Sequence, residues 1–249
     1  MRKIITILFL IFLIQSSAKA QGFDWQYSSR LPFATPKIFF GVDGGLDYNL
    51  HRGDFNFIEQ YFKCCSFMDG DGIGYKIDLK LEYWASAEFA IFGSAGFNYI
   101  PGQFIEQYGP YPDGNGGTQL TEFEFNSKSN YINFEAGIKY RLFITHFFVA
   151  AAFRAAFIID NTNEHLERTI SKASLTWDER IITDGRVPDL KSFIFQPEFK
   201  VGYDLNMGLG AYSSVYIGVA FPIQNQLSEG EWKRWTLSAG VSVFPFGIK

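Results

Sequence analysis

One short segment limits what this chain can fold into. Residues 73–84 read IGYKIDLKLEYW, and from Tyr75 to Tyr83 apolar and charged residues alternate without a break. In a β-strand successive side chains point to opposite faces, so one face here would be apolar and the other charged. An α-helix would mix the two kinds around its surface. The segment therefore predicts a strand that lies between an apolar and a charged environment.

The same alternation recurs along the chain. Seven further segments show it, the first three clearly and the others more weakly: residues 132–142, 195–205, 235–243, 38–49, 89–99, 147–157 and 215–221. Together these segments make eight candidate strands. All but residues 215–221 have the roughly nine to eleven residues that a tilted membrane strand needs.

The connections between these strands are alternately short and long. The short ones lie near residues 85–87, 144–145 and 206–210, and the longer ones near residues 50–72, 100–130, 160–192 and 224–231. This layout is typical of bacterial outer-membrane barrels, with the long loops outside the cell and both termini in the periplasm. The sequence predicts an all-β fold, a single eight-stranded antiparallel transmembrane β-barrel over residues 37–249, in the bacterial cell outer membrane.

A soluble β-sandwich or a lipocalin-like barrel would also alternate apolar and polar positions. Such a fold has an apolar interior and a polar exterior. Here the polar face mixes Gly with Lys, Glu and Arg, whereas the apolar face is large, aliphatic and aromatic. Aromatic residues also recur near strand ends, where a membrane interface would lie. The membrane barrel is therefore the favoured interpretation.

The N-terminus is typical of a secretory signal. Arg2 and Lys3 precede the apolar run Ile4–Ile14, and small residues at Ala18 and Ala20 suit cleavage. The run is 11 residues long, and a membrane-spanning helix needs about 20. We expect residues 1–20 to be a cleaved signal peptide and residues 21–36 a periplasmic N-terminal segment.

The charge of the exported part argues against one class of partner. Without residues 1–20 the chain has 19 Lys and Arg against 26 Asp and Glu, a net charge near −7. Nucleic-acid binding draws much of its affinity from Lys and Arg contacts to phosphate. An acidic chain without a basic cluster is therefore not expected to bind nucleic acid.

The charged faces of the predicted strands would line the barrel interior. They contain seven acidic residues, Asp43, Asp47, Asp78, Glu82, Glu135, Glu198 and Asp204, and six basic residues, Lys76, Lys80, Lys139, Arg141, Arg154 and Lys200. An eight-stranded barrel is about wide enough for its own side chains to fill. We expect a paired charge network that fills the lumen, with a narrow ion or solute path as the alternative.

Residues suited to catalysis or metal binding are few. The chain has three histidines, His51, His146 and His165, and no catalytic triad order or metal-ligand spacing. We expect no enzymatic activity, no cofactor and no metal site. A lipid-modifying barrel enzyme would have to use His51 or His165 and is the less favoured alternative. The segment TWDERIITDG, residues 176–185, suggests a small hairpin in the third long loop.

The two cysteines, Cys64 and Cys65, are adjacent within the first long loop. Neighbouring Cα atoms lie about 3.8 Å apart, below the usual disulfide range, so a bridge between them would be strained. We nevertheless expect a vicinal disulfide, because the compartment is oxidising and no third thiol competes. A redox or intermolecular role is the alternative.

Residues 41–83 carry a resemblance to a known family. The segments GLDYNLHRGDF, CC and GDGIGYKIDLKLEY resemble the first hairpin of outer-membrane barrels from the Bacteroidetes and Chlorobi lineages. Those barrels are similar to the barrel domain of outer membrane protein A. The matching positions are Asn49, His51, Phe55, Cys64, Cys65, Gly70, Gly72 and Gly74. Many members add a C-terminal peptidoglycan-binding domain, which we do not expect here because the chain ends at Lys249.

These observations give one functional expectation with two alternatives. The favoured role is structural, or a surface interaction through the outer loops with a partner that the sequence does not name. A narrow pore or a channel for small solutes or apolar molecules is the first alternative, and a lipid-modifying enzyme is the second. Outer-membrane lipid, lipopolysaccharide and the barrel-assembly machinery are the other expected partners.

Overall fold

The computed structural model describes residues 38–55, 66–86, 88–112, 118–142, 145–171, 177–187, 189–208, 211–228 and 230–248. The expected signal peptide, the expected periplasmic segment and the cysteine pair Cys64 and Cys65 lie outside these residues. No helix in the described part of the chain is long and apolar enough to cross a membrane.

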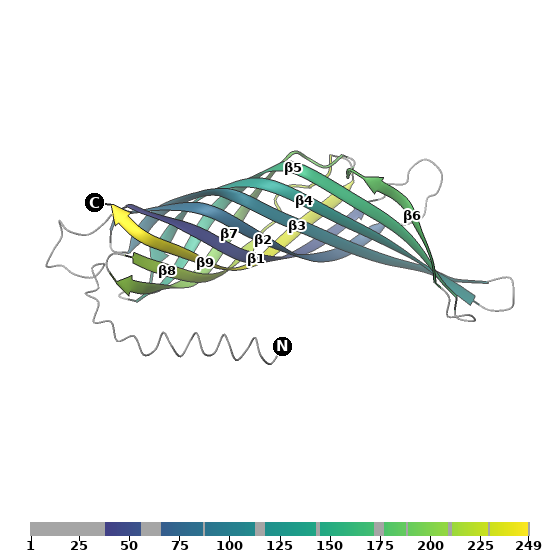
Figure 1. The fold of residues 1–249 in the computed structure, drawn as a ribbon, viewed down its shortest axis with the longest axis horizontal. Helices are drawn as coiled ribbons and strands as arrows, with labels where there is room; N and C mark the ends of the chain where they lie inside the picture. Colours follow the sequence, from purple (N-terminus) through teal and green to yellow (C-terminus); the bar gives the residue numbers. More distant parts are fainter. Residues whose placement is uncertain are drawn as a thin grey trace.

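The described residues form nine strands, of which eight close into a ring (Figure 1). The strands are β1 (Ile38–Phe55), β2 (Phe67–Trp84), β3 (Phe89–Pro112), β4 (Thr118–Arg141), β5 (Phe147–Ser171), β6 (Trp177–Gly185), β7 (Phe193–Gly208), β8 (Ala211–Ala220) and β9 (Glu231–Ile248). Each of β1–β5 pairs antiparallel with the next strand, β5 also pairs with β7, and β9 closes the ring by pairing with β1. The predicted eight-stranded antiparallel barrel is confirmed.

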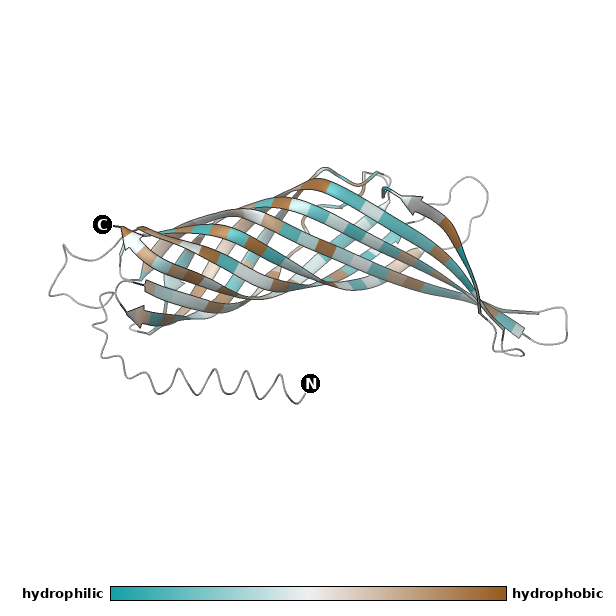
Figure 2. Ribbon diagram, in the orientation of Figure 1, coloured by the Kyte–Doolittle hydropathy of each residue, from teal (hydrophilic) through white to brown (hydrophobic). Residues whose placement is uncertain are grey.

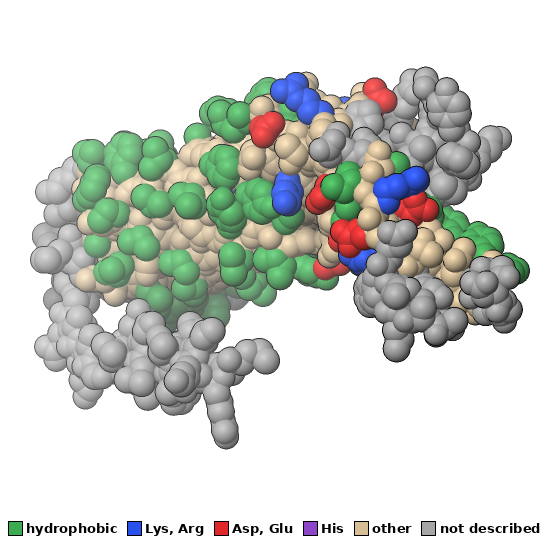
Figure 3. All heavy atoms as spheres, turned by 45° about the vertical axis from the view of Figure 1, so that its right-hand side comes forward, with side chains coloured by type: hydrophobic (Ala, Val, Ile, Leu, Met, Phe, Trp, Pro, Cys, Tyr) green, Lys and Arg blue, Asp and Glu red, His purple; other side chains and the backbone are tan. Residues whose placement is uncertain are grey.

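The two faces of each barrel strand have opposite character, as the alternation requires. On β2, Leu79 is 71% exposed on the outside, whereas its neighbours Asp78 and Lys80 are buried inside. Ile73, Phe199 and Ile217 are likewise exposed on the outside. Apolar and polar residues alternate along the strands in Figure 2, and apolar side chains cover the barrel in Figure 3. A closed ring with an apolar exterior satisfies every backbone group and can cross lipid.

Strands β3, β4 and β5 continue beyond the barrel at one end, where β6 pairs with β5. The β3–β4 pairing runs without a gap in the ladder from Phe89 and Tyr140 to Tyr108 and Thr121, and resumes after an irregularity to reach Pro112 and Thr118. After Phe157, β5 no longer pairs with β7. It stays paired with β4, and from Asn163 onward it pairs with β6 on its other side. We call the paired ends 105–112, 118–128, 161–171 and 177–185 the extension. It projects past the other strands in Figure 1.

The extension occupies residues that the sequence suggested would form long loops. Most of residues 100–130 and much of residues 160–192 are paired strand. The glycines and prolines near Pro101 and Gly109 resemble loop residues in sequence, but the ladder continues through or resumes after them. The segment 176–185 does not fold on itself as a separate hairpin. Its residues 177–185 form β6, which pairs with the end of β5.

The lipid-facing surface of the barrel and the surface of the extension can be compared by a matched pair of substitutions. Leu79→Arg places a cation on the lipid-facing side of the barrel, where the expected cost is about 2–4 kcal/mol of unfolding free energy. Ile105→Arg makes the same change in the extension, where Ile105 is 47% exposed beside polar neighbours, and should cost less than about 1 kcal/mol. Denaturant unfolding in lipid vesicles measures both. Equal costs would contradict a membrane-facing position for Leu79.

Candidate functional site

The candidate site is the lumen together with the extension above it. All thirteen charged residues that the sequence assigned to the inward face are buried. A fourteenth, Arg234 on β9, is also buried there, which gives the lumen seven acidic and seven basic side chains. The predicted strand at residues 235–243 did not include Arg234, because the alternating pattern is clear only from Trp235 onward. The strand in fact begins at Glu231, and the same period-two pattern extends through it.

Arg154 on β5 is the centre of the upper half of this network, the half nearer the extension. Its guanidinium Nη2 lies 2.6 Å from Glu198 Oε2 and 3.8 Å from Glu135 Oε2, and its Nη1 lies 3.7 Å from Asp47 Oδ2. Lys200 forms ion pairs with the same two glutamates, Glu135 and Glu198. Three carboxylates from β1, β4 and β7 therefore converge on one guanidinium.

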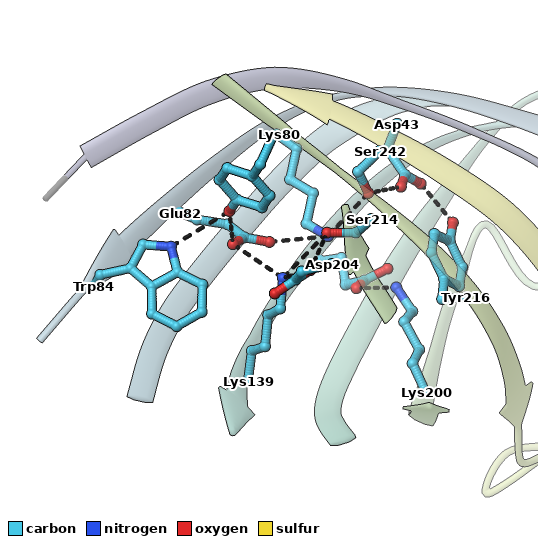
Figure 4. Close-up of polar contacts among 12 residues, drawn as sticks. Asp43, Lys80, Glu82, Trp84, Lys139, Lys200, Asp204, Ser214, Tyr216 and Ser242 are labelled. Atoms are coloured by element: carbon cyan, nitrogen blue, oxygen red, sulfur yellow. Dashed lines mark hydrogen bonds and ion pairs between the residues drawn. The ribbon is translucent and has the colours of Figure 1, made fainter. Parts of the chain in front are cut away.

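Lys139 on β4 is the centre of the lower half. Its Nζ lies 2.8 Å from Asp204 Oδ1 and 3.4 Å from Glu82 Oε2. Arg141 Nη2 lies 2.6 Å from the other oxygen of Asp204, and Lys80 Nζ lies 3.4 Å from Glu82 Oε1. Figure 4 shows Glu82, Lys139 and Asp204 reaching toward one another from different strands.

Lys80 and Ser242 join the two halves. Lys80 Nζ donates to Ser242 Oγ at 3.3 Å, and Ser242 donates to Asp43 (Figure 4). Lys76 Nζ then lies 3.7 Å from Asp43 and 3.9 Å from Glu198. The ion pairs and hydrogen bonds thus form one connected network along the lumen. Buried charges are tolerated when they are paired in this way.

Inward-facing glycines leave the space that the network occupies. A Cβ atom at Gly240 would overlap the ring of Tyr216, whose hydroxyl donates to Asp43 at 2.7 Å. A Cβ atom at Gly96 would overlap the Asp78 side chain. The glycines that alternate with charged residues on these strands therefore allow large side chains from facing strands to cross the lumen.

Aromatic side chains close the lower end of the lumen, where β1 begins and β9 ends. Phe39, Trp84, Tyr212 and Phe244 form a buried cluster there with Ala90. The Tyr212 and Phe244 rings stack with centroids 4.5 Å apart. Tyr212 donates to Glu82, and the Arg141 guanidinium lies 4.0 Å from the Trp84 ring centroid. The layer is bonded directly to the charges above it.

A larger apolar cluster, which we call the upper cap, closes the other end. It contains Phe55, Phe67, Phe104, Phe123, Phe125, Val187, Leu227 and Trp232, all buried. The rings of Phe55 and Trp232 stack at 5.1 Å, and Phe104 meets both edge-on. Phe123 and Phe125 lie in the extension, and Phe104 directly precedes its β3 part. The extension is therefore packed onto the barrel mouth by apolar contacts.

His51 and His165, the two histidines considered for lipid chemistry, lie inside this end, away from lipid. His51 is 2% exposed and accepts a hydrogen bond at Nδ1 from Trp232 Nε1 at 2.9 Å, while its Nε2 lies 3.1 Å from the Pro101 carbonyl. His165 is 1% exposed, and its ring lies 5.4 Å from the Phe67 ring. Burial lowers the pKa of His165. His146 lies near the lower end, beside Tyr203.

Arg234 forms a separate polar layer between the network and the upper cap. Gln196 Oε1 accepts from its Nη2 at 2.9 Å, and the Tyr131 ring centroid lies 5.8 Å from its guanidinium carbon. No carboxylate of a described residue lies within ion-pair distance of Arg234. Its positive charge offsets the single excess carboxylate of the network below, so that lumen charges are equal in number.

The outer face of the extension is braced by a polar cluster. Arg168 on β5 lies 2.9 Å from Glu122, 3.4 Å from Glu124 and 3.3 Å from Glu179, which joins β4, β5 and β6. Gln103 on β3 donates to Glu124 at 2.6 Å. With the upper cap on its inner side, the extension is held on both faces. It forms an ordered sheet instead of loose loops.

The described residues do not suggest metal chemistry. No group of three or more His, Cys, Asp or Glu side chains among them is arranged to hold a metal ion. Most acidic residues of the lumen, and Glu122 and Glu124 of the extension, are instead ion-paired with lysine or arginine.

Comparisons with known proteins give only distant similarities. No family model matches the chain, and no curated protein matches it. Among solved structures, Ail of Yersinia pestis in complex with the heparin analogue sucrose octasulfate is 11% identical, with 83% of this chain and 98% of that one covered and a TM-score of 0.32. Neisserial surface protein A is 11% identical, with 82% and 96% covered and a TM-score of 0.37. The toluene transporter TodX of P. putida is 10% identical, with 88% and 92% covered and a TM-score of 0.19.

Similarities this weak support no inference, and the conclusion rests on the barrel itself. The ring has eight antiparallel strands, an apolar exterior and a polar interior. These features together are those of a bacterial outer-membrane barrel, since lipid accepts sheet structure only as a closed ring. The chain is therefore an outer-membrane β-barrel.

The network predicts that removing its central cation is costly. Arg154→Met should lower the free energy of unfolding by about 3–5 kcal/mol, because Glu198 and Glu135 are left buried with less compensation. Arg180→Met is the matched control, because Arg180 pairs with Glu167 at 2.9 Å on the exposed extension and should cost less than about 1 kcal/mol. Denaturant titration in vesicles measures both. Similar costs for the two variants would contradict the central role of Arg154.

Proposed function

We propose that this barrel is a non-conducting membrane anchor that presents the extension at the cell surface for contact with other molecules. One observation carries the proposal. The lumen is filled with paired charges between two aromatic layers, whereas the strands continue past the apolar band as a braced sheet. The filled part stabilises the barrel in the membrane, and the extension supplies the surface.

A pore is the less favoured role because opening the lumen would require breaking its buried contacts. An ion path would have to displace the upper cap, the lower aromatic layer and the ion pairs between them. Separating a buried pair costs several kcal/mol, since both charges are left without a partner in a low dielectric. The network has several such pairs, centred on Arg154 and Lys139. The proposal therefore assigns neither transport nor catalysis to the lumen.

The extension has properties that suit a contact surface. It is ordered by backbone pairing, it lies beyond the apolar band, and its outer face combines the Arg168 cluster with exposed apolar residues such as Ile181. Binding to an ordered surface loses less conformational entropy than binding to a flexible loop. Outer-membrane lipid and lipopolysaccharide would surround the apolar band, and the barrel-assembly machinery would insert it. The partner of the extension would be a molecule outside the cell or in the outer leaflet.

Planar-bilayer recording on the refolded protein tests the non-conducting part. The expected result is a baseline without stable conductance steps in potassium chloride, under conditions where insertion is verified by the heat-dependent gel shift of folded barrels. Reproducible unitary steps from the wild-type protein would contradict the proposal and favour the pore.

An epitope experiment tests the position of the extension. A short tag placed between Pro112 and Thr118 should be reached by antibody on intact cells, because these residues end the β3–β4 pairing. The control is the same tag between Trp84 and Phe89, at the opposite end of the barrel, which should be reached only after permeabilisation. The reverse pattern would remove the basis for a surface role.

A further inference from the structure

We propose that the free edge of β6 binds an extended segment of a partner polypeptide by antiparallel strand addition. This inference rests on the surface role proposed above and names the kind of partner. Among the described residues β6 is hydrogen-bonded only to β5, whereas every other strand has neighbours on both sides. Alternate residues of β6 therefore direct their backbone N–H and C=O groups away from the sheet, which is a template for another strand.

The two edges of the extension are not equivalent. The opposite edge is β3, whose described pairing with β2 ends at Phe104 and Gly70. Beyond that point β3 contains Pro110 and Pro112, which have no N–H to donate and which block the addition of a strand. The β6 sequence, WDERIITDG, contains no proline. Strand addition is thus hindered at one edge and allowed at the other.

The side chains of β6 indicate what the added strand would carry. Glu179 faces Arg168 on the outer side, and Ile181, two residues further on, is 58% exposed. Arg180 lies on the other side, exposed and paired with Glu167. The Cβ atoms of directly opposite residues on neighbouring strands lie about 4.5–5.5 Å apart, so their side chains are in contact. A matching strand has a basic residue beside Glu179, an aliphatic residue beside Ile181 and an acidic residue beside Arg180.

A second copy of this chain does not fit the edge. Two barrels in one membrane are related by an axis along the membrane normal, which would leave their β6 strands parallel. Parallel pairing is slightly less stable per residue, and in register it would place Glu179 beside its own counterpart. The three acidic residues and one basic residue of β6 disfavour such a pair. The occupant is therefore a segment of a different protein.

A designed peptide tests the inference on the full-length protein in lipid nanodiscs. The probe is the fluorescein-labelled heptapeptide Thr-Val-Val-Glu-Lys-Thr-Val, which in antiparallel register places Lys beside Glu179, Glu beside Arg180 and Val beside Ile181. We expect saturable binding by fluorescence anisotropy with a Kd below about 1 mM. A peptide with Lys and Glu exchanged should bind at least several-fold more weakly.

Backbone methylation separates strand pairing from simple charge attraction. One peptide is N-methylated at one set of alternate residues and a second peptide at the other set. Only one set faces β6 in an added strand, so one peptide should lose about tenfold in affinity while the other keeps it. Glu179→Gln should weaken binding, and Glu231→Gln, on β9, which does not pair with β6, should leave it unchanged.

Two results would overturn the inference. Equal effects of the two methylation patterns would mean that side-chain charge alone holds the peptide. Absence of saturable binding would mean that the edge does not accept a strand. The proposed function fails separately, through unitary conductance or an inaccessible epitope. A barrel that passes both of those tests but does not bind the peptide keeps its surface role and loses only the strand-addition site.

Discussion

Charge compensation inside a closed ring is the condition on which this structure depends. Fourteen ionisable side chains, seven of each sign, are buried in the lumen of an eight-stranded barrel. Each would be costly without a partner. Twelve of them form ion pairs, most of these between strands, while Asp78 accepts a hydrogen bond from Asn133 and Arg234 donates one to Gln196. Arg154 and Lys139 connect five strands of the ring, β1, β2, β4, β5 and β7, through ion pairs. The network stabilises the ring, and the ring keeps water and lipid away from the network.

The same network separates the two ends of the molecule. Below it, the aromatic layer of Tyr212 and Phe244 seals the end that carries the last residue of β9. Above it, the upper cap seals the mouth and also supports the extension, because Phe104 and Phe125 belong to strands that continue outward. In the proposed function, these two layers and the network between them keep the lumen closed to solutes. The proposed function assigns contact to the sheet above the membrane, where prolines lie at one edge and β6, among the described residues, pairs only with β5.

The sequence was sufficient to predict the part of the fold in which apolar and polar residues strictly alternate. The alternation in residues 73–84 predicted the barrel and the inward direction of Lys76, Asp78, Lys80 and Glu82. It missed Arg234, one residue before the recognised pattern, and it missed the extension, because glycine and proline near Gly109 resemble a loop. The upper cap could not be predicted, since Phe55, Phe104 and Trp232 meet only after the ring has closed. The proposed bridge between Cys64 and Cys65 stays a prediction.

The central claim is that the lumen charges are paired and shielded from water. Nuclear magnetic resonance of the arginine side chains in lipid nanodiscs tests it most directly, by hydrogen exchange of the Nε–H and Nη–H groups. Arg154 and Arg141, both buried and ion-paired, should retain guanidinium protons far longer than the exposed Arg52. Exchange of Arg154 as fast as that of Arg52 would show a hydrated, open lumen and would contradict the account.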